Sequence, residues 1–472
     1  MKLDRLDRAA LSVMAAIASV IGVILWRGDQ VGVRITRATP PAGAESVPIR
    51  PLLSFTFSEA MMADSLEGRV RLFPEITGSL RWNGATAFFA PAGPLQPDTA
   101  YTVTIQAGAR SERGRLLLRD AQWSFRTGHP RVVYLSPALE IGDLYLAEID
   151  AATPPRRLTS EPYGVFDFAI SPDGARIVYS ANRDDSGARD LWLIDLEGSR
   201  RELLVACDQQ VCQSPSWAAD SVRIAFERRA LVEGAVGRAP GPARIWLIDS
   251  LTRQAAPLFS ETGDDAGQKL GALPRWAPVG DRLAYYDPLE SAITVVDTRS
   301  GEIVQLPSVL GDSGAWSPEG SQLIYPDLVA VDAGQFSQML RADLTTNVIT
   351  PLTELKTAND ASIAWSPSGA WIAFSRQSIG SGSGFGALGP QVWISSVKDG
   401  AARPLTDQPE FSYGGLRWSS DEKWIVAVRT SLRTPNPQPE VWLIRVDQTP
   451  GLAEQRLLAT NATIPALSLI HI

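Results

Sequence analysis

Histidine and cysteine are almost missing from this sequence. Its 472 residues include two histidines, His129 and His471, and two cysteines, Cys207 and Cys212. A Ser-His-Asp or Cys-His catalytic arrangement and a His-ligated zinc site need imidazole groups that the chain hardly has. We therefore expect no catalytic residue, no bound cofactor and no metal site.

A concentration of positive charge is also lacking. The chain has 44 Lys and Arg against 52 Asp and Glu, a formal net charge of -8, and the charges are dispersed. Binding to a phosphate backbone needs a basic surface. The composition therefore excludes nucleic acid as an expected partner, while 44% apolar and 20% charged residues indicate a folded protein.

The two cysteines are too few for a structural zinc site, and their C-x4-C spacing does not match a C-x-x-C motif. Two alternatives remain open. In an oxidising compartment Cys207 and Cys212 would bridge a small loop, whereas in the cytosol they would be ordinary thiols. A possible disulfide between them is the one site prediction that the sequence allows.

One long apolar run lies near the amino end. The 18 residues Ala9–Trp26 carry no charge, which is long enough for a transmembrane helix. Lys2, Arg5 and Arg8 precede the run, so the positive-inside rule places the amino terminus in the cytoplasm. A cleaved signal peptide is the alternative, although the run exceeds a usual signal-peptide core. We predict that residues 1–30 are a cytoplasmic tip and a single-pass signal-anchor, with the bulk of the chain extracytoplasmic, in the periplasm or at the cell surface.

Residues 31–128 consist of short alternating runs broken by Pro and Gly, which predicts an all-β module. Seven strands in under 100 residues favour a β-sandwich. The predicted strands are Val33–Arg37, Leu53–Phe57, Val70–Phe73, Gly78–Trp82, Ala87–Ala90, Tyr101–Ile105 and Gln122–Phe125.

Four blocks in this module occur in the order found in a known family: Pro40–Gly43 (PPAG), Phe55–Met61 (FTFSEAM), Leu95–Val103 (LQPDTAYTV) and Trp123–Gly128 (WSFRTG). In these blocks the module resembles the bacterial Ig-like domain of the SbsA type. The resemblance implies an extracytoplasmic spacer or adhesive module and no catalytic activity.

The rest of the chain repeats one pattern, typified by Ala364-Trp-Ser-Pro-Ser-Gly369. Each copy is followed by an alternating strand, a loop, a third strand and a short edge strand. The copies are centred on Ile170, Trp217, Trp276, Trp316, Trp365 and Trp418. Units of four strands that recur about every 40–50 residues are typical of a β-propeller. The tryptophans are expected to pack between its blades.

The repeats resemble the TolB-type, WD-like propeller family, from about residue 131 to the end. We therefore predict a β-propeller over residues 129–472, with seven blades favoured and six or eight left open. A natural and a truncated carboxyl end are both left open. The first unit, which begins near Val132–Leu135, has only three strands. Pairing of Pro465–Ser468 with that segment would complete the blade and close the ring.

The Ser171-Pro-Asp-Gly174 turn does not predict a catalytic site. In the other five copies the position of Asp173 is occupied by Asp, Val, Glu, Ser and Asp, a mixture that suits a turn better than a shared catalytic carboxylate. Gly384–Gly389 matches G-x-G-x-x-G, but it lies between two strands and so fails the condition for a dinucleotide site.

The long loops that do not repeat are 182–190, 228–244, 377–391 and 430–440. Because each connects a second strand to a third, we expect them on one face, where a propeller usually binds its partner. The sequence thus favours a membrane-anchored, extracytoplasmic binding or scaffold protein that engages protein or glycan through this face. The alternative is the non-catalytic propeller portion of a peptidase-like or polysaccharide-acting hydrolase.

Overall fold

The computed structural model describes residues 13–22, 32–45, 47–49, 51, 53–93, 95–149, 153–196, 198–234, 237–259, 269–331, 334–353, 358–378, 388–446 and 453–463. The chain divides into two compact units, Met1–Gly128 and His129–Ile472. Each unit is described by itself.

The only part of the predicted membrane segment that the structure describes is a helix over residues 13–22. The remainder of the predicted span 9–26 lies outside the described residues. Among the helices of the described ranges, none has both the length and the apolar character required to cross a bilayer.

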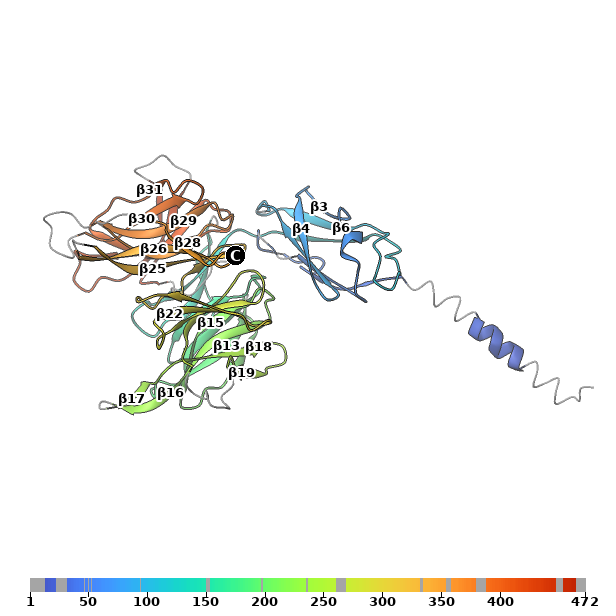
Figure 1. Cartoon of the computed structure of the whole chain (residues 1–472), viewed down its shortest axis with the longest axis horizontal. Coiled ribbons are helices and arrows are strands. Elements are labelled where there is room, and N and C mark those ends of the chain that lie inside the picture. The colour runs from blue at the N-terminus through green and yellow to red at the C-terminus, as the bar shows by residue number, and fades with distance from the viewer. Residues whose placement is uncertain are drawn as a thin grey trace, which may run out of the picture. The chain divides into compact units, whose positions relative to one another are not determined.

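The seven strands predicted for the first unit are confirmed, and they form two antiparallel sheets (Figure 1). One sheet has the order β1-β2-β5-β4, formed by Ile35–Thr39, Leu53–Phe57, Thr86–Pro91 and Gly78–Asn83. The other has the order β3-β6-β7, formed by Val70–Phe73, Ala100–Ile105 and Ala121–Arg126, and a short helix, η1 (Ala63–Ser65), lies between β2 and β3 in the chain. Alternate residues such as Phe55 and Val103 are fully buried in one cluster shared by both sheets, which is the packing of a β-sandwich.

Within the described residues the second unit contains six sheets, one of which has nine strands. In that sheet a single parallel pair, Arg189 in β13 with Val211 in β15, joins two antiparallel meanders. These meanders are counted separately as sheets 2 and 3, which gives seven sheets in chain order. Sheet 1 consists of β8 (Arg131–Ser136), β9 (Asp143–Glu148) and β10 (Arg156–Arg157). Sheet 2 consists of β11 (Val165–Ile170), β12 (Arg176–Asn182), β13 (Arg189–Asp195) and β14 (Arg201–Val205). Sheet 3 consists of β15 (Gln210–Trp217), β16 (Arg223–Gly234), β18 (Arg244–Asp249) and β19 (Ala255–Pro257), with β17 (Gly237–Pro240) paired to the far part of β16.

Sheets 4 to 7 repeat the same meander. Sheet 4 consists of β20 (Ala272–Trp276), β21 (Arg282–Asp287), β22 (Ala292–Asp297) and β23 (Ile303–Pro307). Sheet 5 consists of β24 (Ala315–Trp316), β25 (Gln322–Val331), β26 (Gly334–Asp343) and β27 (Val348–Pro351). Sheet 6 consists of β28 (Ala358–Trp365), β29 (Trp371–Ser378), β30 (Gln391–Ser396) and β31 (Ala402–Pro404), and sheet 7 of β32 (Phe411–Trp418), β33 (Trp424–Ser431), β34 (Glu440–Arg445) and β35 (Gln455–Thr460).

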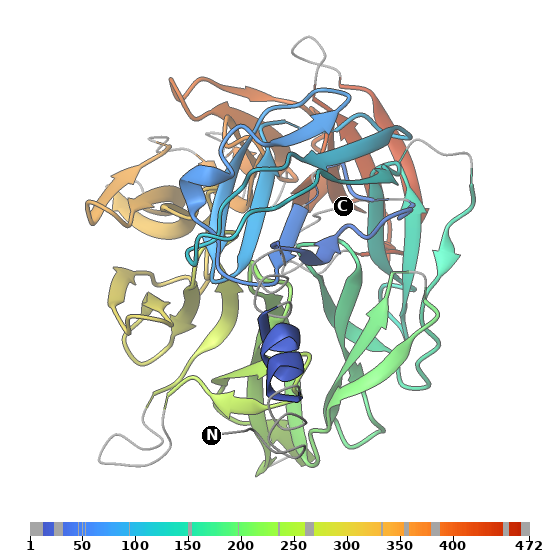
Figure 2. The ribbon, with the colours of Figure 1, turned by 90° about the vertical axis from the view of Figure 1, so that its right-hand side faces the viewer.

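Hydrophobic clusters lie between consecutive sheets, because strands buried on both faces carry near-continuous apolar side chains. Separate clusters join sheets 2 and 3, 3 and 4, 4 and 5, 5 and 6, and 6 and 7. Another cluster contains residues of sheets 1, 2 and 7, among them Val133, Tyr179 and Leu443. Figure 2 shows the sheets following one another in chain order from green through yellow and orange to red.

Successive strands within each sheet run in opposite directions, so the connections between strands lie at one of two ends of the sheet. We call the end at which a first strand passes into a second the turn end, and the opposite end the loop end. Connections from second to third strands, and from each sheet to the next, lie at the loop end. Neighbouring first strands contact one another, as β11 does with β15 and β28 with β32, so the first strands converge.

The two ends of the second unit also meet. Leu135 in β8 pairs with Thr463 through two backbone hydrogen bonds of 2.9 Å, and the Ser136 hydroxyl donates to the Asn461 carbonyl. Ala462 belongs to the cluster that includes sheet 1. The predicted closing strand Pro465–Ser468 lies outside the described residues, so its pairing beside Val132–Leu135 stays a prediction.

Candidate functional site

The repeated Ser-Pro-Asp-Gly element forms a hydrogen-bonded turn at the turn end. The Ser171 hydroxyl donates to the Asp173 carboxylate at 2.5 Å and accepts the backbone N–H of Arg176 at 2.9 Å. Asp173 Oδ1 also accepts the backbone N–H of Ala175 at 3.1 Å. The carboxylate is therefore used within the turn, as the sequence predicts.

The two copies that lack the turn glycine keep the same backbone conformation. Gly174 has a φ of 67°, and Ser221 and Glu422, at the same place in their copies, have φ values of 56° and 61°. This left-handed region is costly for residues with a Cβ. Both side chains bond to a neighbouring turn: Ser221 Oγ accepts the N–H of Asp173 at 3.1 Å, and Glu422 Oε2 accepts the Ser368 hydroxyl at 2.9 Å.

The repeated tryptophans pack between sheets, as expected, and they also form a hydrogen bond that the sequence does not reveal. The indole N–H of Trp217 donates to the carbonyl of Ala169 in the preceding sheet at 3.1 Å. The same bond joins Trp316 to Arg275, Trp365 to Ala315 and Trp418 to Ala364, at 3.0 to 3.1 Å. Trp276 is the exception, because its buried indole N–H makes no hydrogen bond.

The predicted long loops lie at the loop end, but two of the seven sheets are extended there by strands. Within the predicted loop 228–244, β16 continues to Gly234 and its last residues pair with β17, and Figure 1 shows this hairpin reaching past the strands beside it. In sheet 5, β25 and β26 remain paired from Gln322 to Val331, so this sheet also projects. Sequence reasoning missed the second extension because no glycine-rich loop marks it. Residues 379–387 of the third predicted loop lie outside the described residues.

Exposed apolar side chains gather in the connections of the loop end. Leu289 is 63% exposed and Val309 is 67% exposed. At the turn end, Leu251 is the exposed aliphatic side chain within a described connection, at 62%. The loop-end set is Leu139, Ile141, Tyr163, Leu289, Val309, Leu310, Leu388 and Leu432. Apolar surface gathered at one end of a molecule is typical of an interaction site.

Gly389, the described end of the G-x-G-x-x-G match, has a packing role. A Cβ at this position would lie 2.0 Å from the carbonyl oxygen of Phe411 in β32. The glycine therefore allows close approach of two backbones. Residues 384–387 of the match lie outside the described residues.

Charged side chains are buried in the halves of the sheets nearest the loop end. Asp167 in β11 is 3% exposed, and its Oδ2 accepts the N–H of Ser214 in β15 at 2.6 Å. Its Oδ1 is buried without a hydrogen bond. Burial, with a smaller contribution from Glu227, raises the pKa of Asp167 to about 7, although the Ser214 amide and Arg189 act in the opposite direction.

Two other buried carboxylates have complete partners. Glu227 in β16 accepts the N–H of Leu273 at 2.7 Å and pairs with Arg229 at 2.7 Å. In sheet 6, Arg376 donates to both oxygens of Asp360, at 2.7 and 2.8 Å, and these two side chains are 4% and 2% exposed. The Glu227–Leu273 bond joins β16 to β20, and the Asp360–Arg376 pair joins β28 to β29.

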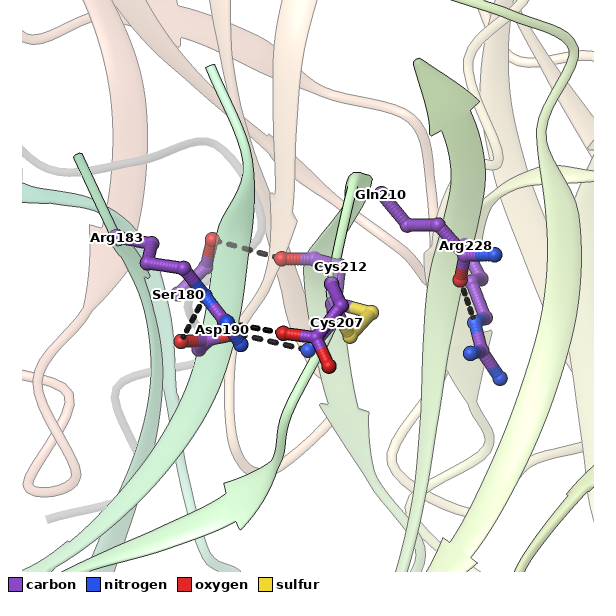
Figure 3. The surroundings of a disulfide bond; sticks show 8 residues. Ser180, Arg183, Asp190, Cys207, Gln210, Cys212 and Arg228 are labelled. Carbon is purple, nitrogen blue, oxygen red and sulfur yellow. Dashed lines mark hydrogen bonds and ion pairs between the residues drawn. A yellow bond between two sulfur atoms is a disulfide. The ribbon is translucent and has the colours of Figure 1, made fainter. Parts of the chain in front are cut away.

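Figure 3 shows the disulfide that joins Cys207, in the connection between sheets 2 and 3, to Cys212 in β15. Both cysteines are fully buried. The Cys207 N–H donates to Asp190 Oδ1 at 2.7 Å, and Arg183 binds both oxygens of the same carboxylate. The Ser180 hydroxyl donates to the Cys212 carbonyl at 2.9 Å. The loop is thus fixed to sheet 2 on both sides of the bridge.

The aspartates in the connections between strands do not form a metal site within the described ranges. No group of three or more His, Cys, Asp or Glu residues is placed there to hold an ion. Asp190 forms an ion pair with Arg183, and Asp184 accepts the N–H of Ser186 at 2.8 Å. Asp264 and Asp265, like His471, lie outside the described residues.

Comparison with known proteins agrees with this organisation. Residues 29–127 match the family model of the bacterial Ig-like domain. The predicted resemblance of residues 31–128 to this domain is therefore confirmed. No curated protein matches the chain.

Among solved structures, the chain is similar to an oligogalacturonate lyase from Vibrio parahaemolyticus at 13% identity, covering 68% of this chain and 87% of that one, with a TM-score of 0.51. It is also similar to TolB from Acinetobacter baumannii at 16% identity, covering 89% of this chain and 98% of that one, with a TM-score of 0.39. At 13% identity, the similarity to the lyase concerns the fold alone.

Proposed function

We propose that this chain is an extracytoplasmic binding or scaffold protein, anchored to the membrane by residues 9–26, whose seven sheets form a closed propeller. Its loop end engages a partner, and its activity is not catalytic. The observation that carries the proposal is the gathering of exposed apolar side chains in the loop-end connections.

Three further features support the proposal. The chain enters the second unit at the start of β8, which is a turn-end position, so the loop end is the end opposite the linker. The disulfide suits an oxidising compartment. The clusters that join sheet 1 to sheets 2 and 7, together with the Leu135–Thr463 pair, support ring closure.

The loop-end side chains favour a protein partner over a glycan. Seven of the eight are aliphatic, and the remaining one is Tyr163. Aliphatic surface is stabilised by contact with another apolar protein surface, which has the same requirement to leave water.

The loop end is tested by site-specific photo-crosslinking of the full-length chain in its membrane. A photoreactive residue at Leu289 or Val309 should give a discrete crosslinked protein. The same residue at Leu251, which is as exposed as Leu289 but lies at the turn end, should give none. Equal crosslinking from both ends, or none from either, would contradict the proposal.

Membrane anchoring and orientation are tested separately. We expect the full-length chain to fractionate with membranes and to resist carbonate extraction. The second unit should be digested by protease added outside the cytoplasm. Release of the chain by carbonate would contradict the anchor without affecting the assignment of the loop end.

A further inference from the structure

Residues 110–119 of the first unit lie beside the point at which the chain enters that unit. The Val33 N–H donates to the Leu116 carbonyl at 2.9 Å. A Cβ on Gly32 would lie 2.5 Å from Leu118 Cγ. The segment therefore lies alongside the first described residues that follow the predicted membrane span.

The segment presents apolar side chains to the outside of the unit. Its three successive leucines alternate, because Leu117 is buried in the core of the sandwich whereas Leu116 and Leu118 are exposed, Leu118 at 58%. This alternation places the two exposed leucines on the side opposite the core. Met62, whose N–H donates to the Arg110 carbonyl at 2.9 Å, adds a third exposed apolar side chain at 47%.

The same segment carries an excess of positive charge. Four arginines against one glutamate, Glu112, give it a formal charge of +3, which the net charge of -8 for the whole chain does not reveal. Asp120, the residue that follows, is used within the unit because its carboxylate accepts the Ala107 N–H at 2.8 Å. All four arginines are exposed, namely Arg110, Arg113, Arg115 and Arg119. We call these arginines, together with Met62, Leu116 and Leu118, the Leu–Arg surface.

The length of the connecting chain limits how far this surface can be from a membrane. Val33 follows Trp26, the last residue of the predicted span, by seven residues. Seven residues reach about 25 Å at most when fully extended. Exposed apolar side chains with arginines around them are suited to the interface of a bilayer, because the apolar groups enter the headgroup region and the arginines attract anionic lipids.

We propose that the Leu–Arg surface docks the first unit on the membrane, with its apolar side chains among the lipid headgroups and its arginines bound to anionic phospholipid. The inference rests on the proposed membrane anchor at residues 9–26. It adds a second contact with the bilayer to this anchor, and that contact determines which end of the first unit faces the membrane.

Site-directed spin labelling of the full-length chain tests the docking. Because its only two cysteines, Cys207 and Cys212, are bonded to each other, an introduced cysteine is the one reactive thiol. Leu118→Cys and Met62→Cys place a nitroxide on two different segments, and each variant is reconstituted in vesicles of phosphatidylcholine and phosphatidylglycerol. Both labels should collide more with lipid-soluble oxygen than with a water-soluble nickel complex. A label on Ala100→Cys, an exposed residue at the end of β6 away from this surface, should show the reverse.

Charge variants test the contact with anionic lipid. Arg113→Gln should lower the ratio of docked to undocked label at position 118 about fivefold, since each arginine near an anionic membrane contributes that preference. Omission of phosphatidylglycerol should lower the ratio further. Arg126→Gln is the matched control, because Arg126 is an exposed arginine that pairs with Ala100 at the opposite end of β6. It should leave the ratio unchanged.

Two results would overturn the inference and leave the anchor intact. One is water-exposed labels at both positions in a chain that resists carbonate extraction, and the other is equal docking with and without phosphatidylglycerol. Labels that are buried in native membranes but not in vesicles would indicate a protein partner and would also overturn it. Release of the chain by carbonate would overturn the anchor and this inference together. If Leu118→Cys does not fold, the label on Met62→Cys decides between these outcomes.

Discussion

The two ends of the seven sheets differ in what they conserve from one copy to the next. At the turn end the same small set of hydrogen bonds recurs, as in Ser171 with Asp173 and Trp217 with Ala169. Toward the loop end the copies differ: sheet 6 has a buried Asp–Arg pair, sheet 2 has a buried Asp with one oxygen that makes no hydrogen bond, and a disulfide lies between sheets 2 and 3. Repetition therefore distributes stability over many small, similar contributions, whereas single large contributions belong to positions that do not repeat.

The largest expected effect is at the Asp360–Arg376 pair. Arg376→Met leaves Asp360 buried and uncompensated, which should cost about 3–5 kcal/mol of unfolding free energy. Urea unfolding of the variant measures this loss. The double variant Asp360→Leu/Arg376→Met should recover most of it, and Arg238→Met, which breaks the exposed pair with Glu233, should change stability by less than about 1 kcal/mol. If Arg376→Met and Arg238→Met lost equal unfolding free energy, the difference between the buried and the exposed pair would be contradicted.

Asp167, in the half of sheet 2 nearest the loop end, provides a pH-dependent test of the comparison. Its pKa is about 7 in the folded chain, above its ordinary value of 3.8. The folded chain thus holds a proton that the unfolded chain releases, so its contribution to stability is present below pH 4 and is lost as pH rises to 7. Asp167→Asn should remove this loss and be more stable than wild type by on the order of 3–4 kcal/mol above pH 7.

Melting temperatures from pH 4 to 8 check this prediction. The gap between Asp167→Asn and wild type should widen up to pH 7 and then stay constant. Asp184, whose pKa is lowered by hydrogen bonds from Ser186, is the control. Its contribution to stability changes only below its ordinary pKa of 3.8, so the gap between Asp184→Asn and wild type should stay constant from pH 4 to 8. A gap that does not change with pH would contradict the burial of an ionisable Asp167.

At the turn end, Trp217 and Trp276 form a natural pair for comparison. Both are buried, but the Trp217 indole donates a hydrogen bond and the Trp276 indole does not. Trp217→Phe should therefore destabilise the chain by about 1 kcal/mol more than Trp276→Phe. Chemical denaturation of the two variants measures the difference, and an equal loss would show that packing alone explains the repeated tryptophans.

The smallest effect is expected at Glu422, which adopts a left-handed conformation in its turn. Glu422→Gly removes this strain but also the exposed bonds to Ser368, so we expect a net gain of about 0.5 kcal/mol. Gly280 has a φ of 83° in the corresponding turn, and a Cβ at this position would meet only open space. Gly280→Ala should lose about 1 kcal/mol through backbone strain alone. Calorimetry measures both changes in stability. If Glu422→Gly and Gly280→Ala changed the stability in the same direction, backbone strain at these turn positions would be contradicted.

The sequence predicted the strands of the first unit well, because Leu53, Phe55 and Phe57 alternate with polar residues on a sandwich strand. It also predicted the repeated sheets, since their tryptophans and turns recur. It could not predict that Asp360 meets Arg376, or that Arg223 in β16 meets Asp281 in the turn between β20 and β21. Those contacts join residues from different strands or sheets, and no local pattern encodes which charges meet after the strands converge.

The extended hairpins carry a consequence for how such a surface changes over generations. In β16–β17 and β25–β26 the backbone ladder simply continues beyond the sheet, with residues paired one to one. An insertion of one residue in each arm lengthens the ladder without reversing which side chains face inward below it, whereas a single insertion shifts the register. The hairpins can therefore lengthen by one residue in each arm at a time. Descendants of this chain could meet new partners in this way while they keep the same core.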